Sequence, residues 1–220
     1  MIARPEILRF GGVMPLHTVG VEVAGSIARG RWNLSYTGNV GNGRWLDART
    51  TQGSGDVDEA KARAAKASLG FEGPISIHAG PMVYVDRIPP DPAVAARKYE
   101  MDETIGGGHL VGRAGPVDAF GEYYRIFHET RGAPGAWTHE GWYALAVYRH
   151  GAWKPYGVVD VTNFKPGDPY FAKLDSDVRR LIAGLRFDAG PMNSFRLEYR
   201  DEARDAGRTH VLAIQTAFAF

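Results

Sequence analysis

The sequence predicts an all-β protein: one antiparallel, up-and-down sheet of about eleven strands, forming a transmembrane β-barrel or an open partial barrel. Apolar and polar residues alternate along much of the chain, the alternating segments are long, and short turns alternate with longer polar loops. Strands of soluble proteins average about 5 to 6 residues, whereas a tilted strand needs about 9 to 11 residues to cross a bilayer. The length of the segments therefore favours strands that span a membrane.

The alternation continues through the whole chain without a linker, so a single domain over residues 1–220 is expected. The predicted strands cover residues 18–29, 31–42, 60–72, 75–87, 103–114, 117–128, 140–150, 152–163, 177–188, 194–203 and 208–220. In the second of them Trp32 and Leu34 alternate with Asn33, and near the end Phe195 and Leu197 alternate with Arg196. A strand places such sets on opposite faces. The face that carries arginine must be wet, because a charge in a dry core is costly.

Four segments fit the strand pattern less well. The run Asp56–Ser68 contains strong helix formers and is an alternative surface helix, and Pro92–Met101 is an alternative short loop helix. Pro81 lies inside an alternating run, where it either weakens the strand prediction or marks a bulge. The glycines between Gly106 and Gly112 predict a place where a bulky side chain from the next strand packs over the backbone.

The connections differ in length in a regular way. Short turns fall at Ala28–Gly30, Glu72–Pro74, Ala114–Pro116, His150–Ala152 and Ala189–Pro191, with longer polar loops between them. Transmembrane barrels have short periplasmic turns and long outer loops. Aromatic rings at the membrane interface are also typical of such barrels, and the candidates are Trp32, Tyr36, Trp142, Tyr148, Trp153 and Tyr199.

The composition excludes several other classes. The chain has no Cys, which rules out disulfides, thiolate metal sites and thiol nucleophiles. Its 26 Lys and Arg against 25 Asp and Glu give a net charge of +1, so no nucleic-acid partner is expected, because phosphate neutralisation needs a basic excess. No run of about 18 apolar residues predicts a transmembrane helix.

The last residues, HVLAIQTAFAF, resemble the C-terminal strand of bacterial outer-membrane proteins. Leu212, Ile214, Phe218 and Phe220 share one parity, and the final residue is aromatic. In that class of protein a terminal Phe serves as the recognition signal for the barrel-insertion machinery. The resemblance therefore implies that Phe218 and Phe220 form an insertion signal.

Further short segments resemble porin-type outer-membrane proteins of Gram-negative bacteria, in the broad neighbourhood of phosphate-selective porins. They are Arg4–Gly12, Tyr36–Gly43, Tyr84–Pro89 and Glu122–Tyr124. The resemblance implies a β-barrel pore in the bacterial outer membrane, with membrane lipid, the insertion machinery and small solutes as partners. The oligomeric state is left open by the resemblance, with a homotrimer as the candidate.

The N-terminus departs from this family. Arg4, Glu6 and Arg9 stand where a signal peptide would be apolar, and an odd number of strands would place the two ends of the chain on opposite sides of the membrane. We therefore expect the C-terminal portion of a longer barrel, whose sheet is open like a trough. The alternative is one further strand within Ile7–Met14.

One parity of the strands supplies the expected lumen. The residues predicted to line the pore are Glu22, Asn39, Tyr84, Glu122, Lys154, Asp160, Arg180, Arg186, Arg196, Glu198 and Arg200. Arginines in the last two hairpins favour anionic solutes, unless they only pair with carboxylates across strands. Arg125 has the opposite parity to Glu122 and indicates a bulge or a wrong parity in that strand. The function expected is passive diffusion of small solutes; the alternatives are a soluble β-barrel carrier and a non-conducting structural outer-membrane barrel.

No enzyme, cofactor or metal site is expected. The chain has no G-x-S-x-G elbow and no phosphate-binding P-loop. His128 and His139 flank an outer loop, and a metal at His139 and Glu140 is a weaker reading than a metal-free loop. The acidic residues Asp56, Asp58 and Glu59 lack the spacing of an EF-hand, so a solvated loop is preferred there.

Overall fold

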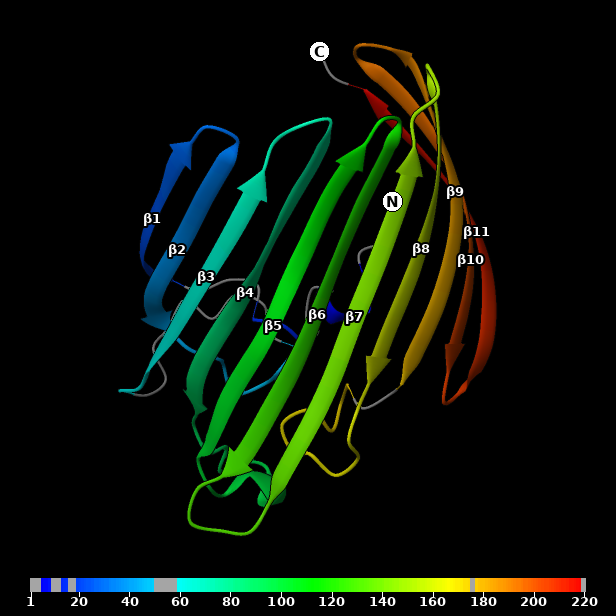
Figure 1. Cartoon of the computed structure of the whole chain (residues 1–220). Coiled ribbons are helices and arrows are strands. Elements are labelled where there is room, and N and C mark those ends of the chain that lie inside the picture. Colours follow the sequence, from blue (N-terminus) through cyan, green and yellow to red (C-terminus); the bar gives the residue numbers. More distant parts are fainter. Residues whose placement is uncertain (1–4, 9–12, 16–18, 50–58, 175–176, 219–220) are drawn as a thin grey trace.

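The computed structural model describes residues 5–8, 13–15, 19–49, 59–174 and 177–218, and it shows one antiparallel sheet (Figure 1). Its 11 strands follow one another in sequence order, each paired with its chain neighbour. The strands are β1 (Gly20–Arg29), β2 (Trp32–Asn42), β3 (Lys61–Phe71), β4 (Ile75–Ile88), β5 (Met101–Ala114), β6 (Val117–Thr130), β7 (Ala136–Tyr148), β8 (Trp153–Asn163), β9 (Val178–Gly190), β10 (Asn193–Arg204) and β11 (Gly207–Phe218). Two short 3₁₀ helices are η1 (Glu6–Leu8) and η2 (Ala95–Arg97).

The predicted up-and-down all-β fold is confirmed, with local corrections. The helix considered over Asp56–Ser68 is wrong from Lys61 onward, because those residues form β3; residues 56–58 lie outside the described part. The loop helix is reduced to η2, and β7 begins at Ala136, earlier than expected. Within the described residues, no helix is long and apolar enough to cross a membrane.

The sheet is open, as the sequence predicted. Among the described strands, β1 pairs only with β2 and β11 pairs only with β10. Because every neighbouring pair is antiparallel and the strand number is odd, β1 and β11 run in the same direction. An antiparallel closure of this sheet would need an odd number of further strands. The alternative of an extra strand within Ile7–Met14 is wrong for Glu6–Leu8, which form η1; residues 9–12 lie outside the described part.

Two proposals about glycine and proline can be checked in the ladder. Gly80 and Pro81 have no partners in β3, but the register resumes unchanged beyond them, so Pro81 interrupts the ladder without a bulge. A Cβ atom at Gly107 would lie 2.8 Å from the ring of Tyr124. The glycine run of β5 therefore does leave room for a bulky residue of the next strand.

The inner side of the curved sheet is filled by other parts of the same chain. Ile7 of η1 packs against β7 so closely that a Cβ at Gly141 would lie 2.6 Å from its Cδ1 atom. Phe171, from the loop between β8 and β9, is fully buried with Ile105 and Ile126. The core thus lies between the inner wall and the segments folded into the trough, and the chain's large exposed apolar side chains lie on the opposite face.

Candidate functional site

The inner wall gathers all the residues that the sequence predicted to line a pore. Cross-strand partners point to the same face of a sheet, and the register connects Glu22 with Asn39, and Asp160 with Arg180. The same parity includes Tyr84, Glu122, Lys154, Arg186, Arg196, Glu198 and Arg200. Asp160 accepts a hydrogen bond from the backbone N–H of Glu6 in η1, which identifies this face as the inner one. Their role in a pore remains a prediction.

Carboxylates surround the arginine nearest η1. The Arg180 guanidinium lies 3.0 Å from Asp160, 2.7 Å from Glu202 and 2.9 Å from Glu6. These contacts join β8, β9, β10 and the N-terminal segment. Since these three partners are acidic and come from different parts of the chain, Arg180 serves mainly to hold the wall together.

Toward the short turns the basic groups are less fully compensated. The carboxylate of Asp188 pairs with both Lys154 and Arg186. Glu198 accepts a hydrogen bond of 2.6 Å from the hydroxyl of Tyr156 and lies 3.6 Å from Arg200. With Arg196, this stretch of β8–β10 carries more cations than carboxylates, and we call it the basic strip: Lys154, Arg186, Arg196 and Arg200.

Tyrosine hydroxyls satisfy carboxylates elsewhere on the inner wall. Tyr124 and Tyr143 both donate to Glu122, each at 2.7 Å, and Tyr84 donates to Asp86 at 2.8 Å. A buried carboxylate is tolerated when its lone pairs are hydrogen-bonded. The carboxylates of Glu122 and Asp86 are therefore hydrogen-bonded within the inner wall itself.

A chain of buried charged groups was missed by the sequence reading. Arg44, in the loop after β2, lies 2.8 Å from Glu103 of β5. Glu103 also contacts Nε2 of His128 at 2.8 Å, and His128 Nδ1 contacts Asp168 at 2.6 Å. Asp168, in the loop after β8, then contacts Nε2 of His139 at 2.7 Å. We call this series the buried ion chain.

The hydrogen bonds indicate which ring nitrogens in the buried ion chain carry protons. The backbone N–H of Lys165 donates to Nδ1 of His139, so Nε2 of His139 carries the proton that is shared with Asp168. His128 has a carboxylate at each ring nitrogen, and both bonds form only when both nitrogens carry protons. His128 is then a cation between Glu103 and Asp168, which balances their charges.

The buried ion chain holds two loops inside the trough. Asp168 also accepts the backbone N–H of Tyr170 at 2.8 Å. The Arg44 guanidinium lies over the rings of Tyr170 and Phe171, with 5.5 and 5.4 Å to the centroids. The hydroxyl of Tyr170 donates to the carbonyl of Trp45 at 2.9 Å, which joins the two loops directly.

The loop members of the chain are stabilised in their charged forms. Burial opposes ionisation of Asp168, but hydrogen bonds from His128 and His139 outweigh it and hold the pKa of this carboxyl well below its ordinary value. Burial likewise opposes the charge of Arg44, yet the neighbouring Glu103 carboxylate raises the pKa of its guanidinium. Both groups therefore stay charged at neutral pH.

The same residues include a possible ligand set for a metal ion. Ligand atoms of His128, His139 and Asp168 lie within 4.8 Å of one another. However, the Lys165 N–H points at Nδ1 of His139, so a proton there would clash with it once Nε2 bound a metal. The donors fit a protonated network better than a metal. The His139 and Glu140 pairing is wrong, because adjacent strand residues point to opposite faces and Glu140 contacts Arg125 outside.

The outer face consists of an apolar band and a charged belt. The band on β8 runs from Trp153 to Val161, about 26 Å along the strand. A strand tilt of about 35–45° would reduce this to about 18–21 Å across a membrane, somewhat less than the apolar band of about 25 Å in transmembrane barrels. Between this band and the long loops lies the charged belt, a row of paired charged side chains on the outer face. Its members include Arg87, Asp102, Arg125, Glu140, Asp201 and Arg208. The bulge or wrong parity proposed from Arg125 is therefore incorrect, because β6 keeps its register and Arg125 pairs with Glu140 outside.

Aromatic residues border this band. At the short-turn end, ring centroids of Trp32 and Phe71 lie 5.1 Å apart, and those of Trp153 and Phe187 lie 4.4 Å apart. Of the predicted interface residues, Trp32, Tyr148 and Trp153 stand at strand ends. Tyr36, Trp142 and Tyr199 stand inside their strands, and Trp142 and Tyr199 lie beside the charged belt. Phe218 of the insertion signal lies exposed on this face; Phe220 is outside the described residues.

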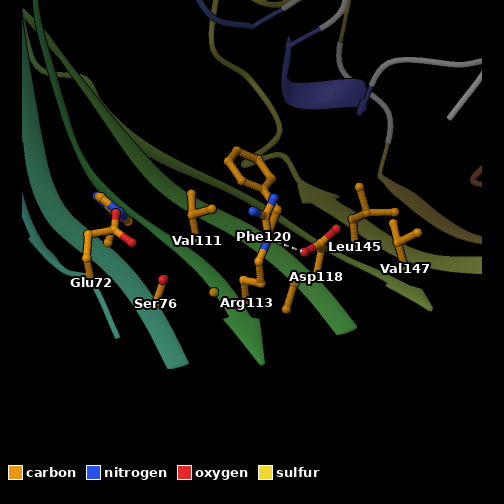
Figure 2. A pocket seen from close by; sticks show the side chains of 11 residues that line it. Glu72, Ser76, Val111, Arg113, Asp118, Phe120, Leu145 and Val147 are labelled. Atoms are coloured by element: carbon orange, nitrogen blue, oxygen red, sulfur yellow. Dashed lines mark hydrogen bonds and ion pairs between the residues drawn. The ribbon is translucent and has the colours of Figure 1, made fainter. Parts of the chain in front are cut away.

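A cavity of about 350 Å³ opens at the short-turn ends of β4–β7 (Figure 2). Its side chains rise on the side of the sheet where η1 lies, so it belongs to the inner wall. It combines apolar residues such as Phe120 and Leu145 with the ion pair of Arg113 and Asp118.

Comparison with known proteins identifies the architecture. No family model and no curated protein matches the chain. Among solved structures, an OmpT variant lacking loop L8, an outer-membrane protein of Vibrio cholerae, matches at 12% identity and TM-score 0.58, with 90% of this chain and 62% of that chain covered. A porin matches at 16% identity and TM-score 0.57, with 91% of this chain and 62% of that chain covered. The anion-selective porin from Comamonas acidovorans matches at 12% identity and TM-score 0.55, with 90% of this chain and 55% of that chain covered.

The chain shares the fold of these outer-membrane β-barrel structures over the part of them that it covers. It spans less than two thirds of the length of the porin-type structures that it resembles. The resemblance that the sequence suggested is thereby confirmed for the fold.

The outer face gives the first prediction. Val159→Arg, in the apolar band, should lower the free energy of unfolding in lipid vesicles by about 2–4 kcal/mol, because arginine near the bilayer midplane is costly. Thr104→Arg, at the height of the charged belt, should cost no more than about 1 kcal/mol. Denaturant titrations of both variants measure this, and equal costs would contradict the proposed membrane position.

The buried ion chain gives the second prediction. Glu103→Gln leaves the Arg44 guanidinium without its carboxylate and should lower the free energy of unfolding by about 3–5 kcal/mol. The control Asp201→Asn, which breaks an exposed pair with Arg208, should have little effect. If both variants were equally stable, the chain would not fasten the loops.

The third prediction concerns the pH dependence of the contacts made by Asp168. Because the pKa of Asp168 is lower in the folded protein, its contribution to stability is complete above the unfolded value near 3.9 and is lost as the pH falls through the folded value. Hydrogen-exchange protection of the Tyr170 amide should therefore be unchanged by Asp168 between pH 7 and 5 and should fall in stronger acid. Asp168→Ala, which removes the acceptor of the Tyr170 N–H, should lack protection at every pH; protection retained in this variant would refute the anchor.

Proposed function

We propose that the chain forms the wall of a bacterial outer-membrane channel for the passive diffusion of small solutes, with a weak preference for anions. The observation that carries the proposal is the segregation of the two faces: charged and tyrosine side chains inside, an apolar band with aromatic borders outside. Membrane lipid would contact the band, and the strand ending in Phe218 would engage the insertion machinery. A homotrimer remains part of this proposal.

The basic strip supports the preference for anions. Lys154 and Arg186 share Asp188, so this part of the wall keeps an excess of positive charge. A charged lining selects solutes through its field. One solved structure of similar fold is described as an anion-selective porin, which agrees with this direction.

A non-conducting structural barrel is the second candidate. It is favoured by the inner segments, because η1 and the loops carrying Arg44 and Phe171 fill part of the trough. A soluble carrier is disfavoured, since it would need an apolar interior. An enzyme is also disfavoured: His128, His139 and Asp168 are at most 1% exposed, so a substrate could not reach them.

The test is the reversal potential across a planar bilayer that separates two concentrations of KCl. Refolded protein in which the sheet is closed into a barrel, as verified by heat-modified gel mobility, should show conductance with a modest preference for chloride. In the double variant Arg186→Gln/Arg196→Gln that preference should shrink or reverse, because the strip loses two cations.

Arg208→Gln, on the outer face, is the matched control and should leave the reversal potential unchanged. A preference for potassium in the unaltered protein would contradict the anion proposal. Absence of any conductance from correctly folded protein would favour the structural barrel.

A further inference from the structure

The cavity at the short-turn end of the inner wall has the composition of a ligand site. Its volume of about 350 Å³ falls within the range of about 300–1,000 Å³ that is usual for small-molecule sites. It lies away from the buried ion chain and from the basic strip, with which it shares no residue. Figure 2 shows its side chains rising side by side from one face of neighbouring strands.

The floor of the cavity is apolar. Val111, Phe120, Leu145 and Val147 come from β5, β6 and β7, and each is only partly buried. The ring of Phe120 is held against Tyr143, with 5.6 Å between centroids. The lumen face of a transmembrane barrel is ordinarily polar, so a half-exposed apolar floor on this face is suited to the apolar part of a solute.

The rim of the cavity carries an exposed guanidinium. Asp118 is shared by two arginines: Arg113 of the lining, whose Nε lies 2.8 Å away, and Arg149 beside the cavity, whose Nε lies 3.1 Å away. Arg149 also donates to the carbonyl of Gly115, so Arg113 is the more available of the two. The Arg113 side chain is 64% exposed, so donors remain available to a further anion.

The acidic group on the opposite rim is already occupied. Glu72 accepts hydrogen bonds from Ser76 and His78, which lower the pKa of its carboxyl, and the contact with His78 Nε2 is 2.6 Å. This carboxylate is thus engaged with its neighbours and stays charged, so it balances one of the two guanidiniums. The donors that remain for a further anion are those of Arg113, whose Nε alone contacts Asp118.

We propose that this cavity binds small amphipathic carboxylates, aliphatic or aromatic acids of a few carbon atoms. The carboxylate would pair with Arg113 and Arg149, and the apolar body would lie on Phe120 and Leu145. The inference deepens the proposed function, because it names a class of solute that the channel would retain on its way through. Binding is weak, since the site is open to the lumen on one side.

The test is ¹⁹F NMR titration of 4-fluorophenylacetate against the refolded chain in micelles. Saturable line broadening is expected, with 4-fluorophenylacetamide, the uncharged analogue, binding about threefold to fivefold more weakly, the factor of an exposed ion pair. Arg113→Gln should weaken binding of the acid by a similar factor and leave the amide unaffected. Leu145→Gln should weaken both.

Arg208→Gln is a closely matched control, because this side chain is also 64% exposed and pairs with one aspartate, but on the outer face. It should bind the acid like the unaltered protein. Circular dichroism and heat-modified gel mobility would establish that each variant is folded. Equal binding of acid and amide, or no effect of Arg113→Gln in folded protein, would overturn the proposal.

Conductance of the same preparations separates this inference from the proposed function. Conductance without saturable binding would overturn the site and leave the channel standing. Binding that depends on Arg113 without conductance would support the site and contradict the channel.

Discussion

The two-residue period of the β-strand is the constraint on which the rest of this structure depends. Each strand must present one row of side chains outward and the other inward. Because the register is kept along the strands, apart from one shift between Asn193 and Ser194 at the start of β10, an apolar row such as Leu181, Leu185 and Phe187 remains continuous with its neighbours, and so does the charged row of Arg180 and Arg186. A one-residue slip would exchange the two faces.

This period explains what the sequence could predict. The strands, their order and the inward direction of residues such as Glu122 and Arg186 all follow from local alternation and the turns. The buried ion chain does not, because Arg44 and Asp168 lie in loops that have no periodicity. Glu103 and His128 did carry a signal, as charged residues of inward parity, but their partners are set by tertiary contacts.

The inner contacts combine rigidity with a polar surface. Each carboxylate of the ion chain has at least one cationic neighbour, and Tyr170 and Phe171 cover the guanidinium of Arg44. Removing water from such charges is costly unless they are all paired. The loops are thus held by ion pairs that depend on one another, so that the loss of one weakens the rest. By contrast, the cavity beside Phe120 is left uncovered, and the positive charges of the basic strip are only partly balanced by carboxylates.

Quenching of tryptophan fluorescence by brominated lipid tests the assignment of the faces most directly. Trp142 and Tyr143 are adjacent on β7, so they stand at the same height but on opposite faces, Trp142 beside Val161 of the outer band and Tyr143 bonded to Glu122 of the inner wall. In variants that keep a single tryptophan, at position 142 or, through Tyr143→Trp, at position 143, bromine on the acyl chains should quench the first strongly and the second weakly. Equal quenching of both, or stronger quenching at position 143, would contradict the account.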